Sequence, residues 1–245
     1  TIEVVYTPVD NTQHAVVNYL DSDKGNEQIA TSGDLTGPAG AKIDYNTTST
    51  INALKGKGYE LVHDGFPKDS VFDHDKTTKQ TYEVILKHAH TTVTPEKPGK
   101  PGDPIDPKNP DGPKYPDGTS KQDLEKTVIR TIDYVDGKGN KVSDPVSQST
   151  KFKGTCVLDK VTGKFVLDDG QETDDPTKGI TWTGDGNLNG QKSPLVPGYH
   201  VIKVSRDSKD SVNVDSTTVN KDTTSYEVTV TYAKNGNIVP VDPSG

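Results

Sequence analysis

The feature that most constrains this chain is a regular series of prolines near its middle. Within 94–118 every third residue is proline, at Pro95, Pro98, Pro101, Pro104, Pro107, Pro110, Pro113 and Pro116. Proline lacks a backbone N–H and fixes φ near −65°, so neither a helix interior nor a central strand accommodates such a run. The conformation that remains is the polyproline II helix, whose three residues per turn would place all the prolines on one face. Collagen is excluded, because the register of Gly99 and Gly102 continues with Ile105.

The proline series therefore predicts a semi-rigid spacer between two folded domains. A proline-rich ligand for an SH3-type domain has the same spacing and is the alternative. The predicted organisation has five parts in chain order. They are a lead-in strand or tail of a preceding unit (1–13), a first domain (14–93), the spacer (94–118), a second domain (119–236) and a lead into a next unit (237–245).

Composition and charge narrow the classes of function. With 36 acidic against 28 basic residues and a formal net charge of −8, the chain lacks the basic face that attracts nucleic acid or an anionic membrane surface. No apolar stretch reaches the roughly 18 residues of a membrane span, so no membrane insertion is expected. The chain begins at Thr1 and contains no methionine, which indicates a fragment of a larger protein. The single cysteine, Cys156, fits a small buried apolar residue better than a reactive thiol.

The two halves of the sequence repeat each other. AVVNYLDSDKGNEQI (15–29) corresponds to VIRTIDYVDGKGNKV (128–142), and both read as an alternating strand followed by a hairpin turn. Further matching pairs are KGYELV (57–62) with PGYHVI (197–202), and TYEVILKH (81–88) with SYEVTVTY (225–232). In the last of these, Tyr226, Val228 and Val230 fall on one face at period two, which predicts a half-buried strand.

One helix is predicted, in the first half. The segment 47–59 combines a candidate N-cap at Thr48 or Ser49, two apolar residues at helical spacing, and a stop at Gly56 or Gly58.

The rest of the chain reads as strands and loops. The corresponding span of the second half favours another hairpin, which turns at TGK (162–164). TIEVVY (1–6) has the alternation of the closing strands. The predicted fold class is mainly β with one short helix.

Several of these phrases resemble the Mub repeat. YLDSDKGNE (19–27), KGYELV (57–62) and YEVILKH (82–88) are similar to its first domain. The phrases DLEKTVIRTIDYVDGKGNKVSDPV (123–146), VTGK (161–164) and SPLVPGYHV (193–201) are similar to its second, MucBP-type domain. The resemblance implies an α+β, ubiquitin-like β-grasp first domain and an elongated β-rich second domain.

The same resemblance implies a function and a location. Mub repeats occur as tandem copies in mucus-binding surface adhesins of lactic-acid bacteria. The expected location is therefore extracellular, on a cell-wall-anchored protein whose anchor lies outside this fragment. The expected partners are host mucin glycoproteins, and some members of the family also bind immunoglobulin.

Motifs of catalysis or cofactor binding are absent from the sequence, so neither an enzyme nor a cofactor is expected. Calcium at the acidic loop 168–175 is one alternative to a simple solvated loop there; its acidic residues are Asp168, Asp169, Glu172, Asp174 and Asp175. His88 and His90 could share a strand face and touch a metal, but two ligands do not make a closed site. Surface histidines are the favoured interpretation, and no metal site is expected.

The remaining function is binding, and the only tryptophan marks the candidate residues. Trp182 could stack on a sugar ring while Asp185, Asn187 and Asn189 bond its hydroxyls, which would make 182–189 a glycan-contact loop. The alternative is that Trp182 is a core residue, as is expected for Tyr59 and Tyr199. The sequence thus predicts a non-enzymatic adhesin repeat with weak, multivalent contacts to mucin glycans. The alternatives are an immunoglobulin-binding module that uses a β-grasp edge strand, and a pure structural spacer.

Overall fold

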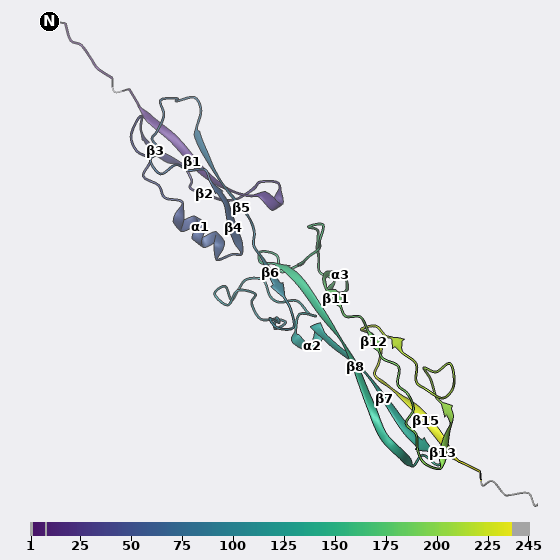
Figure 1. Ribbon diagram of the computed structural model, residues 1–245. Helices are drawn as coiled ribbons and strands as arrows, with labels where there is room; N and C mark the ends of the chain where they lie inside the picture. The colour runs from purple at the N-terminus through teal and green to yellow at the C-terminus, as the bar shows by residue number, and fades with distance from the viewer. Residues whose placement is uncertain (1, 8, 237–245) are drawn as a thin grey trace, which may run out of the picture. The chain divides into compact units, whose positions relative to one another are not determined.

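The computed structural model describes residues 2–7 and 9–236, which are mainly β (Figure 1). The chain divides into two compact units, each built from separate stretches of sequence. Unit 1 comprises the described residues within 1–93, 99–119 and 156–179. Unit 2 comprises those within 94–98, 120–155 and 180–245. No helix in the described part of the chain is long and apolar enough to span a membrane.

Unit 1 contains a sheet in the order β2-β1-β5-β4, with β3 also paired to β1. Its strands are β1 (Thr12–Asp21), β2 (Glu27–Thr31), β3 (Leu35–Pro38), β4 (Tyr59–Asp64) and β5 (Gln80–His88). The central strands β1 and β5 are parallel, and every other pairing in this sheet is antiparallel. Figure 1 shows helix α1 (Thr48–Lys55) along the sheet. This order, with parallel central strands and one covering helix, is the expected β-grasp arrangement.

The sequence pattern explains these elements. Alternate residues of β1 are buried, among them Val17 and Tyr19, because the strand presents one face to the core. The core of this unit also includes Ile51 and Leu54 of α1, as predicted. The predicted cap is wrong: Thr48 and Ser49 lie inside the helix. The Asn46 side chain accepts the Thr48 N–H at 2.7 Å, because its oxygen reaches two residues forward.

The segment 94–118 does not form the predicted polyproline II spacer. Residues 99–119 fold as part of unit 1, and Ile105 is only 8% exposed. Backbone N–H groups of Gly102 and Ile105 donate to the carbonyls of Tyr115 (3.0 Å) and Pro113 (2.9 Å). The prediction failed because proline removes only its own N–H. The two residues between successive prolines still donate, and the proline carbonyl still accepts.

The segment 156–179 completes unit 1. Strand β6 (His90–Val93) pairs with the last residues of β8 (Lys141–Asp159), with His90 opposite Asp159. The predicted hairpin at 162–164 is confirmed, since β9 (Phe165–Val166) turns back along β8. Its turn uses Gly163 at φ +76°, a conformation that favours glycine. Strand β10 (Glu172–Thr173) and the single-turn helix α3 (Pro176–Gly179) follow.

Unit 2 repeats the sheet order of unit 1. The order β8-β7-β15-β13 matches β2-β1-β5-β4, and β7 (Glu125–Asp136) and β15 (Tyr226–Lys234) are again parallel. The remaining elements of unit 2 are α2 (Lys121–Leu124), β11 (Thr181–Thr183), β12 (Asn187–Leu188), β13 (Tyr199–Val204) and β14 (Thr217–Thr218). The predicted burial of Val228 and Val230 is confirmed, and Tyr226 on the same face is half-buried. The internal repeat in the sequence therefore encodes a repeated sheet.

The two ends of the chain complete the description. The predicted strand within 1–6 does not form among the described residues, and Ile2 is 92% exposed. Without a neighbouring strand, an alternating sequence has no backbone partner for its N–H and C=O groups. The predicted lead into a next unit, 237–245, lies outside the described residues.

Candidate functional site

Trp182 lies on a short strand, and the residue opposite it on the neighbouring strand is a glycine. In β11 it pairs with Gly154 of β8, and a Cβ at Gly154 would lie 3.2 Å from the Trp182 ring atom Cη2. The missing side chain at Gly154 lets the indole lie against the strand. Trp182 is half-buried, and Lys221 Nζ stands 5.3 Å from its ring centroid. The residue is therefore anchored in the fold and partly accessible.

The other three predicted contact residues follow Trp182 on the surface. Asp185, Asn187 and Asn189 are all exposed. The Asp185 carboxylate accepts the Asn187 N–H at 3.0 Å, and Thr218 Oγ1 donates to Asn187 Oδ1 at 3.2 Å. The loop is thus held by its own polar groups while its side chains face solvent.

Close backbone contact fixes the turn inside this loop. Gly186 adopts φ +68°, and its carbonyl accepts the Val219 N–H at 2.9 Å. A Cβ at Gly186 would lie 1.9 Å from the Val219 carbonyl oxygen, so a side chain cannot be accommodated. The segment 182–189 is a rigid surface feature of unit 2.

Arg130 of β7 is fully buried and contacts the backbone of this loop. Its Nε and Nη2 donate to Gln148 Oε1 at 3.0 and 2.7 Å. Its Nη2 also donates to the Asn189 carbonyl at 2.7 Å, and its Nη1 donates to Asp207 Oδ2 and the Asp215 carbonyl, both at 3.0 Å. All five N–H groups of the guanidinium are thereby used.

The positive charge of Arg130 affects the pKa of its carboxylate partner, Asp207. Burial would raise the pKa of Asp207, but hydrogen bonds from Tyr226 and Arg130 outweigh it and hold that pKa below its usual range. Sequence reasoning missed this network. Its signal was an arginine on the face of β7 that also carries the buried Val128 and Ile132.

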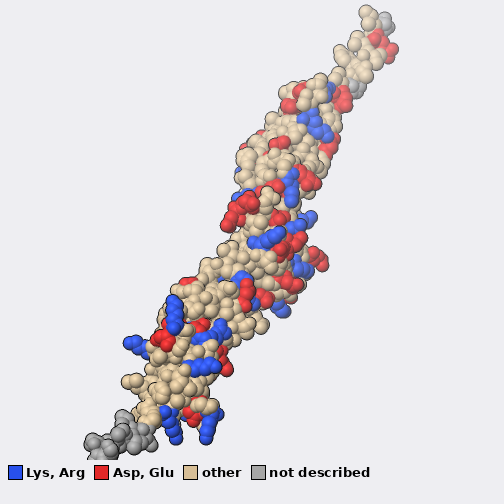
Figure 2. Space-filling view, turned by 90° about the vertical axis from the view of Figure 1, so that its right-hand side faces the viewer, with Lys and Arg blue, Asp and Glu red and all other residues tan. Residues whose placement is uncertain are grey.

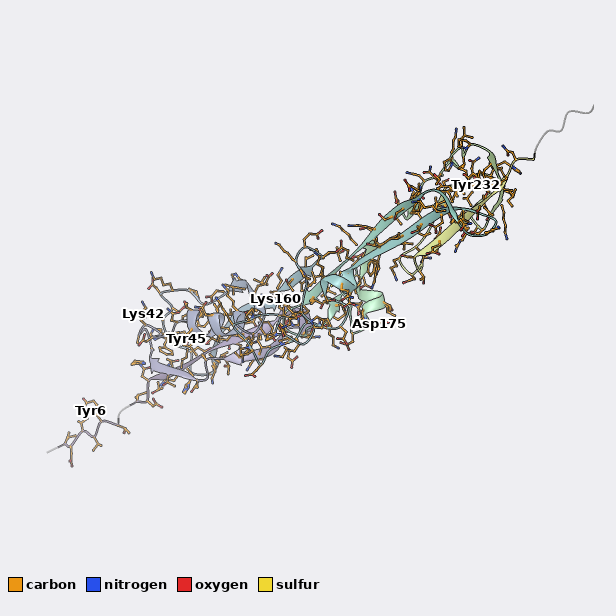
Figure 3. The ribbon with its side chains drawn as sticks, turned by 90° about the horizontal axis from the view of Figure 1, so that it is seen from below. Tyr6, Lys42, Tyr45, Lys160, Asp175 and Tyr232 are labelled. Carbon is orange, nitrogen blue, oxygen red and sulfur yellow. The ribbon has the colours of Figure 1, made fainter. Side chains whose placement is uncertain are left out.

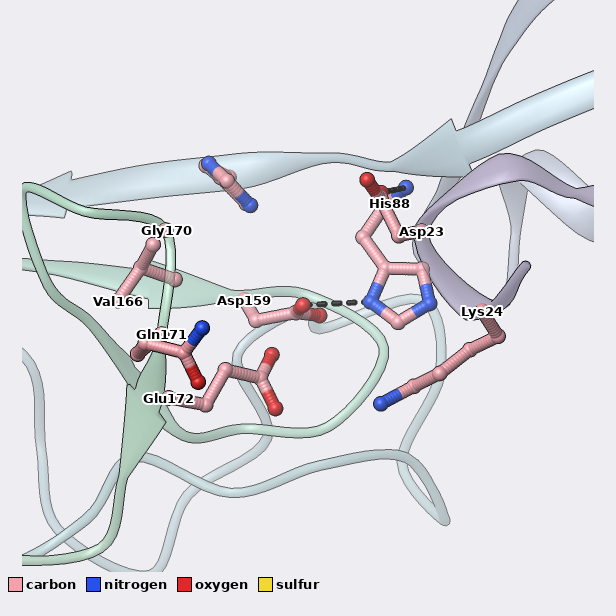
Figure 4. Close-up of a pocket in the computed structure, with 9 residues that line it drawn as sticks. Asp23, Lys24, His88, Asp159, Val166, Gly170, Gln171 and Glu172 are labelled. Atoms are coloured by element: carbon pink, nitrogen blue, oxygen red, sulfur yellow. Dashed lines mark hydrogen bonds and ion pairs between the residues drawn. The ribbon is translucent and has the colours of Figure 1, made fainter.

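A second polar centre lies in unit 1, around His88. The imidazole Nδ1 lies 2.5 Å from Asp159 Oδ2 (Figure 4). Its Nε2 lies 2.8 Å from Asp21 Oδ2, and all three side chains are at most 4% exposed. The main-chain N–H of His88 donates to Asp23 Oδ2 at 2.7 Å. The expectation of a surface histidine is therefore wrong for His88. Its partners are distant in sequence and invisible to a local pattern, whereas His90 is exposed as expected.

The charges at this centre are mutually dependent. Burial alone would lower the pKa of His88, but hydrogen bonds to Asp159 and Asp21 raise it above the ordinary value. Burial opposes ionisation of Asp159, yet hydrogen bonds from Glu172 and His88 keep its pKa low. Burial and the hydrogen bond with the neighbouring Asp159 raise the pKa of Glu172 above its ordinary value.

A cavity of about 430 Å³ opens beside these groups. His88, Asp159 and Glu172 line it together with Asp23, Lys24 and His90. Figure 4 shows the carboxylates of Asp159 and Glu172 facing the His88 ring. In unit 2 the positions of Asp21 and His88 are taken by Tyr134 and Tyr232, which form an edge-to-face pair with ring centroids 6.4 Å apart.

The acidic residues of 168–175 do not converge on one point. Asp168, Asp169 and Asp174 are exposed, and Asp175 accepts the Thr177 N–H at 2.9 Å beside α3. Only Glu172 joins a group of potential ligands. Within the described residues such groups are two, Asp21–Asp23–His88 and His88–Asp159–Glu172, and both contain His88.

Three further predictions concern single side chains. Cys156 is buried, as predicted, and burial raises the pKa of its thiol to about 11. Tyr59 and Tyr199 are half-buried and pack against the cores of units 1 and 2, as predicted.

Two further features of the surface are a second cavity and the distribution of charged side chains. Figure 3 labels Lys42 and Tyr45, which line a separate cavity of about 630 Å³ in unit 1. Figure 2 shows acidic and basic side chains intermixed on the visible face, so the net charge of −8 forms no single-sign patch there.

Comparison with known proteins places the chain in a family. Residues 13–88 match the family model described as a mucin binding domain, and residues 119–236 match the model described as a Muc B2-like domain. The crystal structure of Mub-RV is 28% identical, with a TM-score of 0.60, over 91% of this chain and 100% of that chain. No curated protein matches the chain.

Two other solved structures are similar. The type 2 repeat of the mucus binding protein MUB from Lactobacillus reuteri is 26% identical over 91% of this chain and 100% of that chain, with a TM-score of 0.43. The mucin-binding domain of a Streptococcus pneumoniae protein is 26% identical over 46% of this chain and 94% of that chain, with a TM-score of 0.34.

Both family models occur here in chain order, and the repeated β-grasp sheet order gives each a structural counterpart. The chain therefore belongs to the Mub-repeat family, with a mucin binding domain followed by a Muc B2-like domain.

Proposed function

We propose that this chain is a repeat of an extracellular, cell-wall-anchored adhesin that binds mucin glycans and performs no chemistry. The membership of residues 13–88 in the mucin binding domain family supports binding to mucin. The observation that carries the contact site is the half-buried Trp182, anchored over Gly154 beside the exposed Asp185, Asn187 and Asn189.

The geometry of this loop suits a sugar. An indole offers an apolar face to the C–H groups of a sugar ring and an N–H donor at its edge. Carboxylate and amide side chains supply acceptors and donors for hydroxyl groups. Because the loop is already ordered by Gly186 and Arg130, little conformational entropy is lost when a glycan binds.

A single small loop gives weak binding, so the proposed adhesion depends on repetition. Tandem copies on one chain, facing many copies of a glycan on mucin, can raise the overall affinity by about 10²–10⁴. Such avidity needs no extra contact in each repeat.

Trp182 is expected to dominate the contact. Replacing Trp182 with alanine should weaken binding to a mucin-coated surface by roughly 30-fold, since buried tryptophan anchors contribute about 2 kcal/mol or more. Surface plasmon resonance with the full chain measures the effect. Asn189→Ala should weaken binding less, and it keeps the backbone carbonyl that Arg130 holds.

The control for this experiment is Leu195→Ala, which removes a fully exposed apolar side chain of the same unit. It should leave binding unchanged. Equal binding by the Trp182→Ala variant and the unaltered chain would exclude this loop as the contact site.

Two alternatives give different results with the same chain. An immunoglobulin-binding module would use an edge strand such as β4, whose pairing with β5 is irregular between Leu61 and His63. That function predicts that the chain captures immunoglobulin and that this capture does not depend on mucin glycans. A pure spacer predicts no capture of mucin, even when the chain is presented in many copies.

A further inference from the structure

The centre around His88 assembles three metal-ligand types from three separate segments. His88 ends β5, Asp159 ends β8 and Glu172 begins β10. One potential ligand atom from each lies within 4.8 Å of the others. Imidazole nitrogen with two carboxylates is a donor set that binds divalent transition metals.

Each of these side chains is held in place by other groups. Asp159 Oδ1 accepts the N–H groups of Val161 (2.7 Å) and Thr162 (3.0 Å), which leaves Oδ2 directed at His88. Thr162 Oγ1 donates to Glu172 Oε1 at 3.0 Å. A preorganised donor set of this kind reduces the entropic cost of binding an ion.

His88 also has the support that metal-bound histidines have. Its Nε2 faces Asp21 Oδ2 at 2.8 Å, and both groups are buried. A histidine that binds a metal through one nitrogen usually donates its other N–H to a carboxylate, which fixes the ring and increases its basicity. Nδ1, the nitrogen nearer to Asp159 and Glu172, is then the ligand atom.

The local charge favours a cation. Four carboxylates gather here, of which those of Asp21 and Asp159 are buried, that of Glu172 is partly buried and that of Asp23 is exposed; His88 and Lys24 are the nearby basic side chains. An excess of negative charge among buried groups is unfavourable unless it is neutralised. A bound divalent ion supplies positive charge at the point where these carboxylates meet.

We propose that His88, Asp159 and Glu172 form a binding site for a divalent transition metal ion, and that zinc is the ion this site prefers. The cavity of about 430 Å³ beside them has room for water in the fourth position. Zinc would replace the direct contact between His88 Nδ1 and Asp159 Oδ2, which lie 2.5 Å apart, because a tetrahedral ion needs its ligand atoms about 3.3 Å apart. These two atoms therefore have to separate by about 0.8 Å. Calcium is not the expected ion, because it takes six to eight oxygen ligands.

The site would join two segments of unit 1. His88 belongs to the matched mucin binding domain, whereas Asp159 and Glu172 belong to the matched Muc B2-like domain. Zinc therefore fastens residues 156–179 to the β-grasp sheet of unit 1. In unit 2, Tyr232 stands at the position of His88 and Tyr134 at that of Asp21, so this histidine and its supporting carboxylate have no counterpart there.

Isothermal titration of the full chain, without a histidine tag, with zinc chloride tests this proposal. One zinc ion per chain is expected, and calcium chloride at the same concentration should give no comparable signal. Glu172→Gln preserves the size and the hydrogen bond from Thr162, so the variant should fold. It should bind zinc at least about 100-fold more weakly, because loss of a ligand exceeds the 10–100-fold effect of losing a supporting group.

The control is His63→Gln, which removes an exposed histidine of the same unit. It should bind zinc like the unaltered chain. Absence of zinc binding, equal affinity in the Glu172→Gln variant, or stronger binding of calcium would each overturn the proposal.

Discussion

Replacing Arg130 with methionine is expected to lower the free energy of unfolding of unit 2 by about 3–5 kcal/mol. Methionine fills much of the volume but offers none of the five N–H donors. Asp207 loses its nearest cation, and the carbonyls of Asn189 and Asp215 lose a partner. A buried group left without its partner keeps its desolvation cost and loses its compensation.

Denaturant unfolding monitored by tryptophan fluorescence measures this effect, because Trp182 is the only tryptophan and lies in unit 2. The matched control is Arg206→Met. Its guanidinium lies 3.7 Å from the Tyr226 ring centroid but its side chain is 52% exposed, so a loss of about 1 kcal/mol or less is expected. Equal midpoints for the two variants would show that the Arg130 network contributes little to stability.

Replacing His88 with leucine is expected to destabilise unit 1 by a similar amount, about 3–5 kcal/mol, in metal-free protein. Leucine leaves the carboxylates of Asp21 and Asp159 facing each other in a buried site without the cation between them. The like charges then repel in a medium of low dielectric constant.

Hydrogen exchange followed by mass spectrometry separates this effect from unit 2. In the His88→Leu variant, amides of β5 should exchange faster, while those of β15 should keep their protection. His90→Leu is the control, because His90 is exposed two residues further on and should change stability by less than about 0.5 kcal/mol. Unchanged exchange in β5 would mean that the buried charges around His88 do not stabilise this unit.

The sheets of both units were predictable because their signals are local. Alternation at period two and the hairpin turns mark β1, β7 and β15 without reference to distant residues. The repeat of these patterns across the chain also predicts that the second sheet copies the first. The helix α1 was predictable for the same reason, from two apolar residues at helical spacing.

The proline-rich segment was not predictable in this way. Its conformation depends on hydrogen bonds between residues up to 20 positions apart, as between Gly99 and Thr119, and on burial of Ile105. Proline excludes regular helix and interior strand, but it does not exclude an irregular folded loop. Local propensity alone predicts an extended spacer, because the tertiary contacts leave no recognisable pattern in the sequence of this segment.

The candidate sites divide along the same line. The loop 182–189 is contiguous, so composition alone was enough to select Trp182 and its polar neighbours. His88 meets Asp159 across 71 positions of sequence and Arg130 meets Asp207 across 77. Only the folded sheet brings these groups together, although an arginine among buried alternating positions was a usable signal.

The central claim is that mucin glycans contact the Trp182 loop, and the fluorescence of this single tryptophan tests it directly. Titration of the full chain with O-glycans released from mucin should change the emission of Trp182 in a saturable way and protect it from acrylamide quenching. The change should follow the binding curve measured on a mucin surface. Saturable mucin binding with unaltered emission and quenching would contradict the account, because the glycan would then bind elsewhere.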